Sequence, residues 1–292
     1  MCRKKKVLDL KFPDFSTYQI SDGSDYDLVL FTTAESSKNY GDYKIRNHIR
    51  MLSFFQREFR FKGIVFTNTP SLIAFAKRYK VLTISKYPVN KFHMPLVREM
   101  FTLSQSTFSA SYYGYINSDI LLSPNIIHAV ALAAYNTQLG LLNPYHEIAG
   151  RVHETPKYDK LNITSRATYM RYLKKAKSVM RPFRNEHSAD YFIFPQSVNF
   201  SSFESVVIGR MRVDNYLLGL PHQLNQTEPI GALLDCSHYV LGIHLGRDGY
   251  KHREVRDRLR EEDINWNYQF ASNIKKARSS LVYSDYVYRK HC

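Results

Sequence analysis

Cysteine is scarce in this chain: the three residues Cys2, Cys236 and Cys292 stand far apart in a sequence of 292. Their spacing excludes a disulfide framework and a cysteine-based metal centre. Long apolar runs are missing as well, because the longest, Ile126–Ala134, is too short to cross a bilayer and is interrupted by His128. We therefore expect no transmembrane segment in this chain.

No signal peptide is visible at the start of the sequence. The basic segment 3–6 is not followed by an apolar core of adequate length. We expect the Golgi or secretory lumen as the location if a membrane anchor is missing from this chain, and the cytoplasm otherwise.

Acidic residues are few relative to basic ones, with 26 Asp and Glu against 41 Lys and Arg, so the net charge is +15. The electrostatic field of so positive a chain attracts nucleic acid, phosphates or a membrane surface. The basic residues are spread along the chain and form no recognisable nucleic-acid module, so we expect no nucleic-acid partner. A nucleic-acid-binding protein remains an alternative that only the charge supports.

What the sequence does contain is material for a globular core. Its hydrophobic content is 44% and its aromatic content 14%, with 22 tyrosines able to line a polar pocket. No internal repeat, low-complexity block or linker divides it. We expect a basic and polar tail or stalk over residues 1–24 and one domain over residues 25–292.

Strand and helix patterns alternate through the first third of the chain. Apolar strand patterns at 27–31, 63–68 and 81–84 are separated by helical patterns at 45–59 and 70–78. This alternation is typical of an α/β fold with a mixed, mostly parallel sheet flanked by helices. Further along, the patterns predict helices from Pro95, after Pro124, over 210–220 and in the tail 261–288, strands at 112–122, 139–142, 190–195 and 239–244, and a polar excursion over 150–188.

A short polar interruption, Asn117-Ser118-Asp119, breaks the apolar run 112–122. On an extended chain, Asn117 and Asp119 would point to the same side. One amide oxygen and one carboxylate then make a hard-oxygen site suited to Mn²⁺ or Mg²⁺. The alternative is a strand that ends in a turn, with Asp119 capping the next segment.

Other polar residues are expected at the same edge of the sheet. Ligands of open α/β sheets bind beyond the carboxyl ends of the strands. The polar residues that the patterns place there are Thr32, Thr33, Asn68, Asn117, Asp119 and His244. They predict a metal constellation and a nucleotide-sized crevice in one region.

Four segments in order resemble the motif series of the GT-A fold glycosyltransferases, the nucleotide-diphospho-sugar transferase superfamily. They are Gly114–Leu122, Ala189–Pro195, Ile208–Leu218 and Leu234–Tyr250, and the resemblance spans roughly residues 25–275. It implies a GT-A-like fold and a metal-dependent glycosyltransferase of the hexosyltransferase type. The implied donor is a nucleotide sugar, such as a uridine diphosphate sugar, and the implied acceptor is a glycan or glycoprotein.

The resemblance also implies roles for individual residues. Asn117-Ser118-Asp119 falls where the family has its Asp-x-Asp metal motif, with Asp119 at the position that contacts Mn²⁺ or Mg²⁺, and His244 corresponds to the late metal-binding histidine. Asp214 falls at the acidic position near the acceptor, which would be the base of an inverting reaction.

Further residues are candidates with a competing structural explanation. Asp190 would orient the sugar or cap a strand, and Asp214 would otherwise be a first-turn carboxylate favoured by the helix dipole. Arg98, Arg247 and Lys251 are candidate phosphate-binding cations, and Arg98 would otherwise be an exposed helical residue.

Two alternatives to a glycosyltransferase stay open. Asn117 in place of the first acid, and the altered segment after His244, are also consistent with a degenerate domain that binds a nucleotide, glycan or protein without transfer. A nucleotidyltransferase on a related sheet is the nearest enzymatic competitor.

Overall fold

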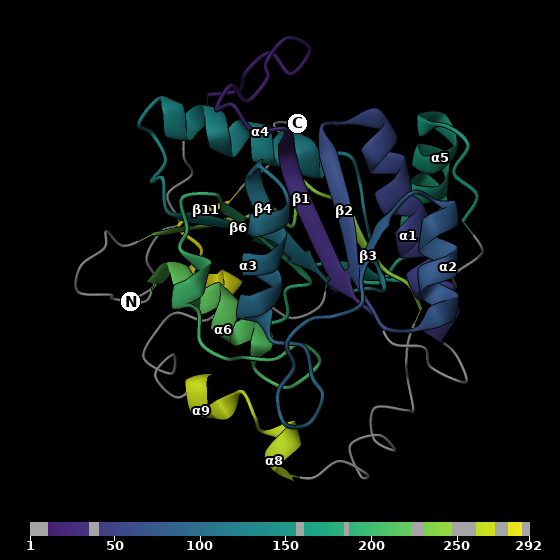
Figure 1. Cartoon of the computed structure of the whole chain (residues 1–292). Helices are drawn as coiled ribbons and strands as arrows, with labels where there is room; N and C mark the ends of the chain where they lie inside the picture. Colours follow the sequence, from purple (N-terminus) through teal and green to yellow (C-terminus); the bar gives the residue numbers. More distant parts are fainter. Residues whose placement is uncertain are drawn as a thin grey trace.

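An eight-stranded sheet forms the centre of the molecule (Figure 1). The computed structural model describes residues 11–34, 41–155, 161–183, 187–222, 231–246, 261–271 and 280–287. In spatial order the strands are β11 (Tyr286–Val287), β9 (Ala232–Asp235), β6 (His146–Gly150), β8 (Tyr191–Pro195), β4 (Ala110–Ile116), β1 (Tyr26–Thr33), β2 (Phe61–Phe66) and β3 (Leu82–Ile84). Only β8 runs against its neighbours, β4 and β6. The predicted mixed, mostly parallel α/β sheet is confirmed.

A second sheet of three strands lies beyond β4 and carries β10 (Gly242–His244) between β5 (Ile120–Leu122) and β7 (His153–Glu154). β10 is antiparallel to β5 and parallel to β7. This small sheet brings three distant parts of the chain together beside the carboxyl end of β4.

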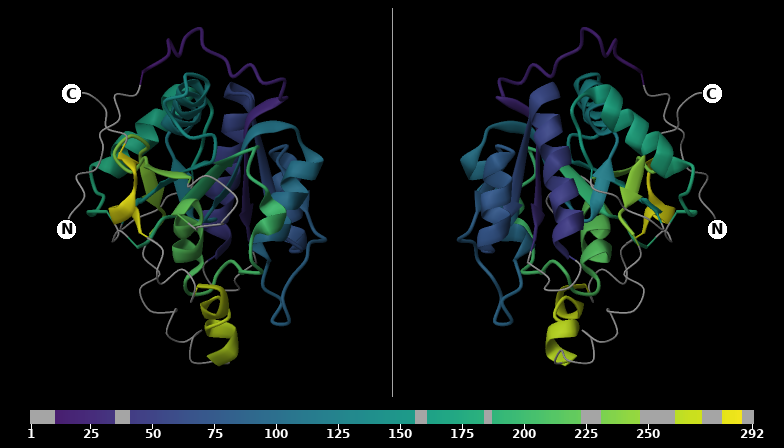
Figure 2. Two further views of the ribbon diagram at one scale, coloured as in Figure 1. Left: turned by 90° about the vertical axis from the view of Figure 1, so that its left-hand side faces the viewer. Right: turned by 90° about the vertical axis from the view of Figure 1, so that its right-hand side faces the viewer.

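Helices cover both faces of the main sheet (Figures 1 and 2). One face packs against α1 (Gly41–Glu58), α2 (Pro70–Arg78), α4 (Asn125–Gln138) and α5 (Arg166–Lys177), and the other against α3 (Val97–Thr107) and α6 (Val213–Gly219). The alternation of β1 is visible in the two cores, because Leu28 and Leu30 face the first group of helices while Val29 and Phe31 face the second.

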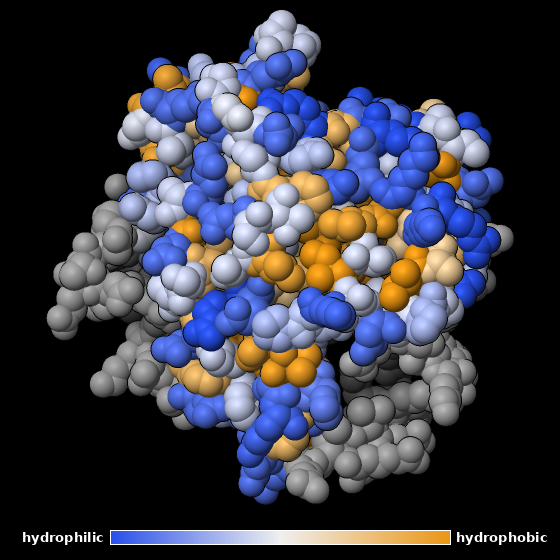
Figure 3. Space-filling model, in the orientation of Figure 1, coloured by the Kyte–Doolittle hydropathy of each residue, from blue (hydrophilic) through white to orange (hydrophobic). Residues whose placement is uncertain are grey.

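Apolar side chains reach the surface in the middle of the face seen in Figure 3, over the region of β1–β3. There β3 forms the edge of the sheet, and all three of its residues are only partly buried. Among the described residues, none of the helices combines the length and the apolar character needed to span a bilayer.

Part of the segment expected to be a tail lies along α4. Phe15 stacks on His128 with ring centroids 4.7 Å apart. Tyr18 meets Tyr135 edge to face, and Ile20 is buried. These contacts place residues 15–20 on the domain, while the expected boundary at residue 24 stays a prediction.

Two of the sequence expectations for single elements are wrong. Residues 139–142 form no strand, because Gly140 ends α4 in the left-handed region (φ +70°) and the N–H groups of Leu141 and Leu142 bond back to the carbonyl of Asn136. The strand of this region is β6, a few residues later. The polar excursion over 150–188 contains a helix that the sequence pattern did not indicate, α5, and Ser165 caps its N-terminus. In the segment 232–244, β9 was not expected and β10 begins only at Gly242.

We predict that Gly114→Ala destabilises the centre of the sheet. A Cβ at this position would lie 2.6 Å from Cγ1 of Ile193 and 2.9 Å from Cδ1 of Leu30, so the neighbouring strands must shift. Urea unfolding should show a loss of about 1–3 kcal/mol, against less than about 0.5 kcal/mol for Ser106→Ala at the exposed end of α3. Equal stability of the Gly114 variant and the unmodified protein would contradict this packing.

Candidate functional site

The carboxyl end of β4 leads into a tight turn. β4 ends at Ile116, and the carbonyl of Asn117 accepts a hydrogen bond from the N–H of Ile120 at 3.2 Å. The extended chain assumed for Asn117 and Asp119 is therefore not present, and the backbone follows the turn that the sequence left as an alternative. The two side chains accordingly meet different partners.

Asp119 pairs with His244. Its Oδ2 lies 2.8 Å from Nε2 of His244, and the side chains are 25% and 9% exposed. The backbone fixes this meeting: His244 is opposite Ile120 in the β5–β10 pair, and the N–H of Leu245 donates to the carbonyl of Asp119 at 2.9 Å. The two metal ligands that the sequence suggests are thus neighbours.

A lysine that the sequence pattern did not suggest lies beside this pair. Nζ of Lys44, a buried residue of α1, lies 3.9 Å from Oδ2 of Asp119. Burial alone would raise the pKa of Asp119, but the hydrogen bond from His244 and the charges of His244 and Lys44 lower it to about 2. Asp119 is therefore a carboxylate, balanced by one cation and one imidazole.

His48 lies one helical turn beyond Lys44 on α1 and is fully buried. Its Nδ1 donates to the carbonyl of Ile120 at 2.7 Å, since a carbonyl can only accept. Burial lowers the pKa of His48 to about 4, although this hydrogen bond and the charge of Asp119 act in the opposite direction. The neutral ring thus secures the first residue of β5.

Asn117 turns towards β8. Its Nδ2 donates to Oδ1 of Asp190 at 3.1 Å, and its Oδ1 accepts from the hydroxyl of Tyr115 at 2.5 Å. Asp190 itself is fully buried and precedes β8, which reaches the carboxyl edge because it is antiparallel to β4. Asn117 therefore links the hydroxyl of Tyr115 to the carboxylate of Asp190 and orients both.

Asp214 belongs to the same region. Burial raises the pKa of the Tyr115 hydroxyl well above its usual value, and the charges of Asp214, Asp119 and Asp190 raise it further. All three acidic residues that the sequence singled out therefore act electrostatically on one hydroxyl. Asp214 lies in the first turn of α6, partly buried.

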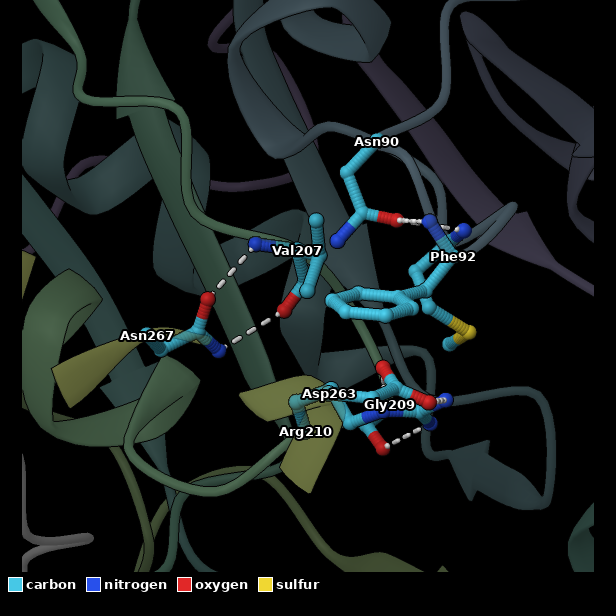
Figure 4. A network of polar contacts seen from close by, with 8 residues as sticks. Asn90, Phe92, Val207, Gly209, Arg210, Asp263 and Asn267 are labelled. Carbon is cyan, nitrogen blue, oxygen red and sulfur yellow. Dashed lines mark hydrogen bonds and ion pairs between the residues drawn. The ribbon is translucent and has the colours of Figure 1, made fainter. Parts of the chain in front are cut away.

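The loop before α6 is held by the C-terminal helices α8 (Glu261–Ile264) and α9 (Tyr268–Ala271) (Figure 4). Asn267 accepts from the N–H of Val207 at 2.8 Å and donates to its carbonyl at 3.0 Å. Arg210 makes a two-pronged ion pair with Asp263, with both distances 2.7 Å. These contacts fix the chain that delivers Asp214.

The remaining candidate residues are two threonines at the end of β1 and three basic residues. Thr32 is fully buried in β1, and Thr33, the last residue of that strand, is partly exposed. Arg98 pairs with Glu99 at 2.8 Å and donates to the carbonyl of Phe203 at 3.5 Å. Arg247 and Lys251 lie outside the described residues.

The donor set suits a divalent ion in part. Asp119 and His244 would supply one carboxylate oxygen and one imidazole nitrogen, which lie 2.8 Å apart. Nε2 donates to Asp119 here, so binding of an ion would release that proton. Over the ranges that the structure describes, no group of three or more His, Cys, Asp or Glu side chains could hold a metal. The other ligands of such an ion would have to come from substrate phosphates and water.

Lys44 and His48 could have been found from the sequence. They stand four residues apart on a helix, next to the apolar stripe that starts with Ile45 and Ile49. Polar residues at that spacing beside a core-facing stripe share one half-buried face. Tyr115 carried no such signal, because it reads as one more aromatic residue of a buried strand.

No family model matches the chain, and no curated protein matches it. Among solved structures, the chain is similar to a Desulfovibrio desulfuricans G20 protein with the provisional description of nucleotide-diphospho-sugar transferase, at 11% identity and a TM-score of 0.42 over 86% of this chain and 98% of that one.

A mycobacterial protein matches at 10% identity and a TM-score of 0.43, over 89% of this chain and 80% of that one. CMP:2-keto-3-deoxy-manno-octonic acid synthetase, complexed with CTP, matches at 11% identity and a TM-score of 0.38, over 79% of this chain and 97% of that one. Likeness at this level carries no argument about activity, so the function proposed below rests on the site.

We predict that His48 makes the fold sensitive to mild acid. Its folded pKa of about 4 lies below the ordinary 6.5, so the unfolded chain binds the proton more tightly and stability falls as pH drops from 6.5 towards 4. Between pH 7 and 5 the protein should lose about 2 kcal/mol more than His48→Gln, which keeps a donor for the Ile120 carbonyl. Urea unfolding at both pH values measures this difference, and parallel losses in the two proteins would contradict it.

Proposed function

We propose that this protein transfers a sugar from a nucleotide-sugar donor, probed best with uridine diphosphate sugars, to a glycan or glycoprotein acceptor with the help of Mn²⁺ or Mg²⁺. The observation that carries the proposal is the arrangement of Asp119, His244 and Lys44 at the carboxyl edge, with Asp190 and Asp214 close by. It combines a cation-binding pair, a buried lysine and two further carboxylates at the edge where α/β sheets bind ligands.

The chemistry needs positive charge where the donor breaks. A nucleoside diphosphate leaves readily only when its developing charge is neutralised, and a divalent ion on Asp119 and His244 would supply that neutralisation. Lys44 adds a fixed ammonium beside Asp119, held in place by α1. Because Lys44 is buried, its charge is little screened by solvent.

The two further carboxylates differ in what they could do for the sugar and the acceptor. Asp190 is fully buried and bonded to Asn117, so it would act on the sugar indirectly, by fixing the Asn117 side chain before a ligand binds. Asp214 is partly exposed and lies in a braced helix, as a base that takes the acceptor proton in an inverting transfer should be.

A second candidate function follows from the small number of metal ligands. Over the described residues, Asp119 and His244 are not joined by a third His, Cys, Asp or Glu side chain that could hold a metal. A domain that binds a nucleotide sugar without transferring the sugar would need no further metal ligand. Calorimetric binding that is indifferent to Mn²⁺, together with absence of turnover, distinguishes this candidate, while release of pyrophosphate identifies a nucleotidyltransferase.

We predict that Asp119→Ala and His244→Ala each reduce Mn²⁺-dependent donor turnover by at least ~100-fold, because both would remove charge stabilisation of the leaving diphosphate. The measurement is release of nucleoside diphosphate from a panel of nucleotide sugars. Asp14→Ala, an acid on the surface before β1, is the control and should retain full activity. Full turnover in the Asp119 variant would refute the assignment.

We predict that Asp214→Asn lowers kcat for transfer by about 10²–10⁴ while the donor affinity stays the same, since a general base acts on the acceptor hydroxyl. The matched control is Glu204→Gln, an exposed acid in the loop before α6, which should leave kcat unchanged. Steady-state kinetics with calorimetric donor binding separate the two effects. Unchanged kcat in the Asp214 variant would exclude Asp214 as the base and leave it the role of a first-turn carboxylate that the helix dipole favours.

A further inference from the structure

Three polar side chains gather around Phe183 on the side of the site away from α1. The imidazole of His153 stacks on the Phe183 ring with centroids 3.8 Å apart, and the guanidinium of Arg151 lies 5.0 Å from the ring centroid. His238 approaches the ring edge to face at 5.2 Å. We call Arg151, His153, Phe183 and His238 the Phe183 cluster.

The guanidinium of Arg151 is incompletely paired. Its Nε is buried, and within the described part of the chain it has no hydrogen-bond partner. The residue as a whole is partly exposed, so a ligand that brings acceptor oxygens can approach Arg151.

The charges that act on His153 in the Phe183 cluster are positive. Burial is the main reason that the pKa of His153 is lowered, and the positive charges of Lys177, His238 and Arg151 lower it further. The hydrogen bond between Nδ1 of His153 and the carbonyl of Arg181 acts the other way. The local potential therefore favours an anion.

The cluster is held in place by the ends of two strands. The N–H of Arg151, the residue after β6, donates to Oγ of Ser237 at 2.9 Å, and Ser237 in turn donates to Asp235 at the end of β9. Both strands are parallel members of the sheet, so Arg151 and His238 stand at its carboxyl edge. Stacking on Phe183 then orients the cations before any ligand arrives.

The Phe183 cluster and Asp119 lie at opposite sides of the small sheet. His153 in β7 is opposite Ile243 of β10, whose other neighbour, β5, follows Asp119. Two strand spacings separate β5 from β7, which is about 10 Å. This separation makes Arg151 a different cationic site from Lys44, on the other side of β10.

We propose that the Phe183 cluster is a second anion subsite, which binds a phosphate or carboxylate carried by the acceptor. The identification of the ligand as the acceptor rests on the proposed function, but the anion site itself does not. Lys44 and the Asp119–His244 pair already serve the donor diphosphate, so the guanidinium of Arg151, with the two imidazoles beside it, serves the other substrate. The acceptor is accordingly an acidic or phosphorylated glycan.

The test is calorimetric titration of the whole protein with inorganic phosphate at constant ionic strength, without donor or metal. Arg151→Ala should weaken phosphate binding at least tenfold, and Phe183→Leu should weaken it severalfold by releasing the stack. Arg171→Ala removes an exposed arginine from α5 as the matched control and should bind like the unmodified protein. Binding that Arg151→Ala leaves unchanged would overturn the subsite.

A second titration separates acceptor from donor. Uridine diphosphate with Mn²⁺ should bind Arg151→Ala and the unmodified protein within twofold, and saturating phosphate should leave this binding unchanged. An equal loss of uridine diphosphate and phosphate affinity in Arg151→Ala would make the Phe183 cluster part of the donor site and refute the proposal. Failure of the proposed sugar transfer would instead appear as missing turnover with phosphate binding intact.

Discussion

The contact between Asp119 and His244 is the interaction on which the candidate site depends. A carboxylate that is three-quarters removed from solvent is stable only when cations or donors surround it, and here they come from three separate parts of the fold. The turn after β4 presents Asp119, β10 presents His244, and α1 presents Lys44. Because β10 pairs with β5, any change in that register would separate the acid from its imidazole.

The need of a buried polar group for partners also explains the other side chains at this carboxyl edge. Buried polar groups need partners, and the side chains beside Asp119 supply them to one another: Tyr115 donates to Asn117, and Asn117 donates to Asp190. The strands behind this edge are apolar and rigid, so the polar groups keep their places without a ligand. Asp214 follows the loop before α6, and Asn267 and Arg210 tie this loop to the C-terminal helices.

Sequence patterns predict the first half of the fold well because those elements follow simple rules. Alternation of apolar strands and helices identifies β1 to β3, and Pro70 marks the start of α2. The pattern fails at β6, where His146 and Glu147 look like loop residues although both are buried. Burial raises the pKa of Glu147 well above its usual value, which no linear pattern reveals.

The site was predictable in its residues more than in its geometry. Asp119, Asp190, Asp214 and His244 can be named from their places at strand ends and in motifs, but the turn at Asn117 and the arrival of Lys44 depend on tertiary contacts. Crystals soaked with Mn²⁺ and a uridine diphosphate sugar test whether Asp119 and His244 hold the metal of the donor site. We expect anomalous density bonded to Asp119 and His244, with the diphosphate against it and near Lys44. A nucleotide bound away from this edge, or a metal that ignores both residues, would contradict it.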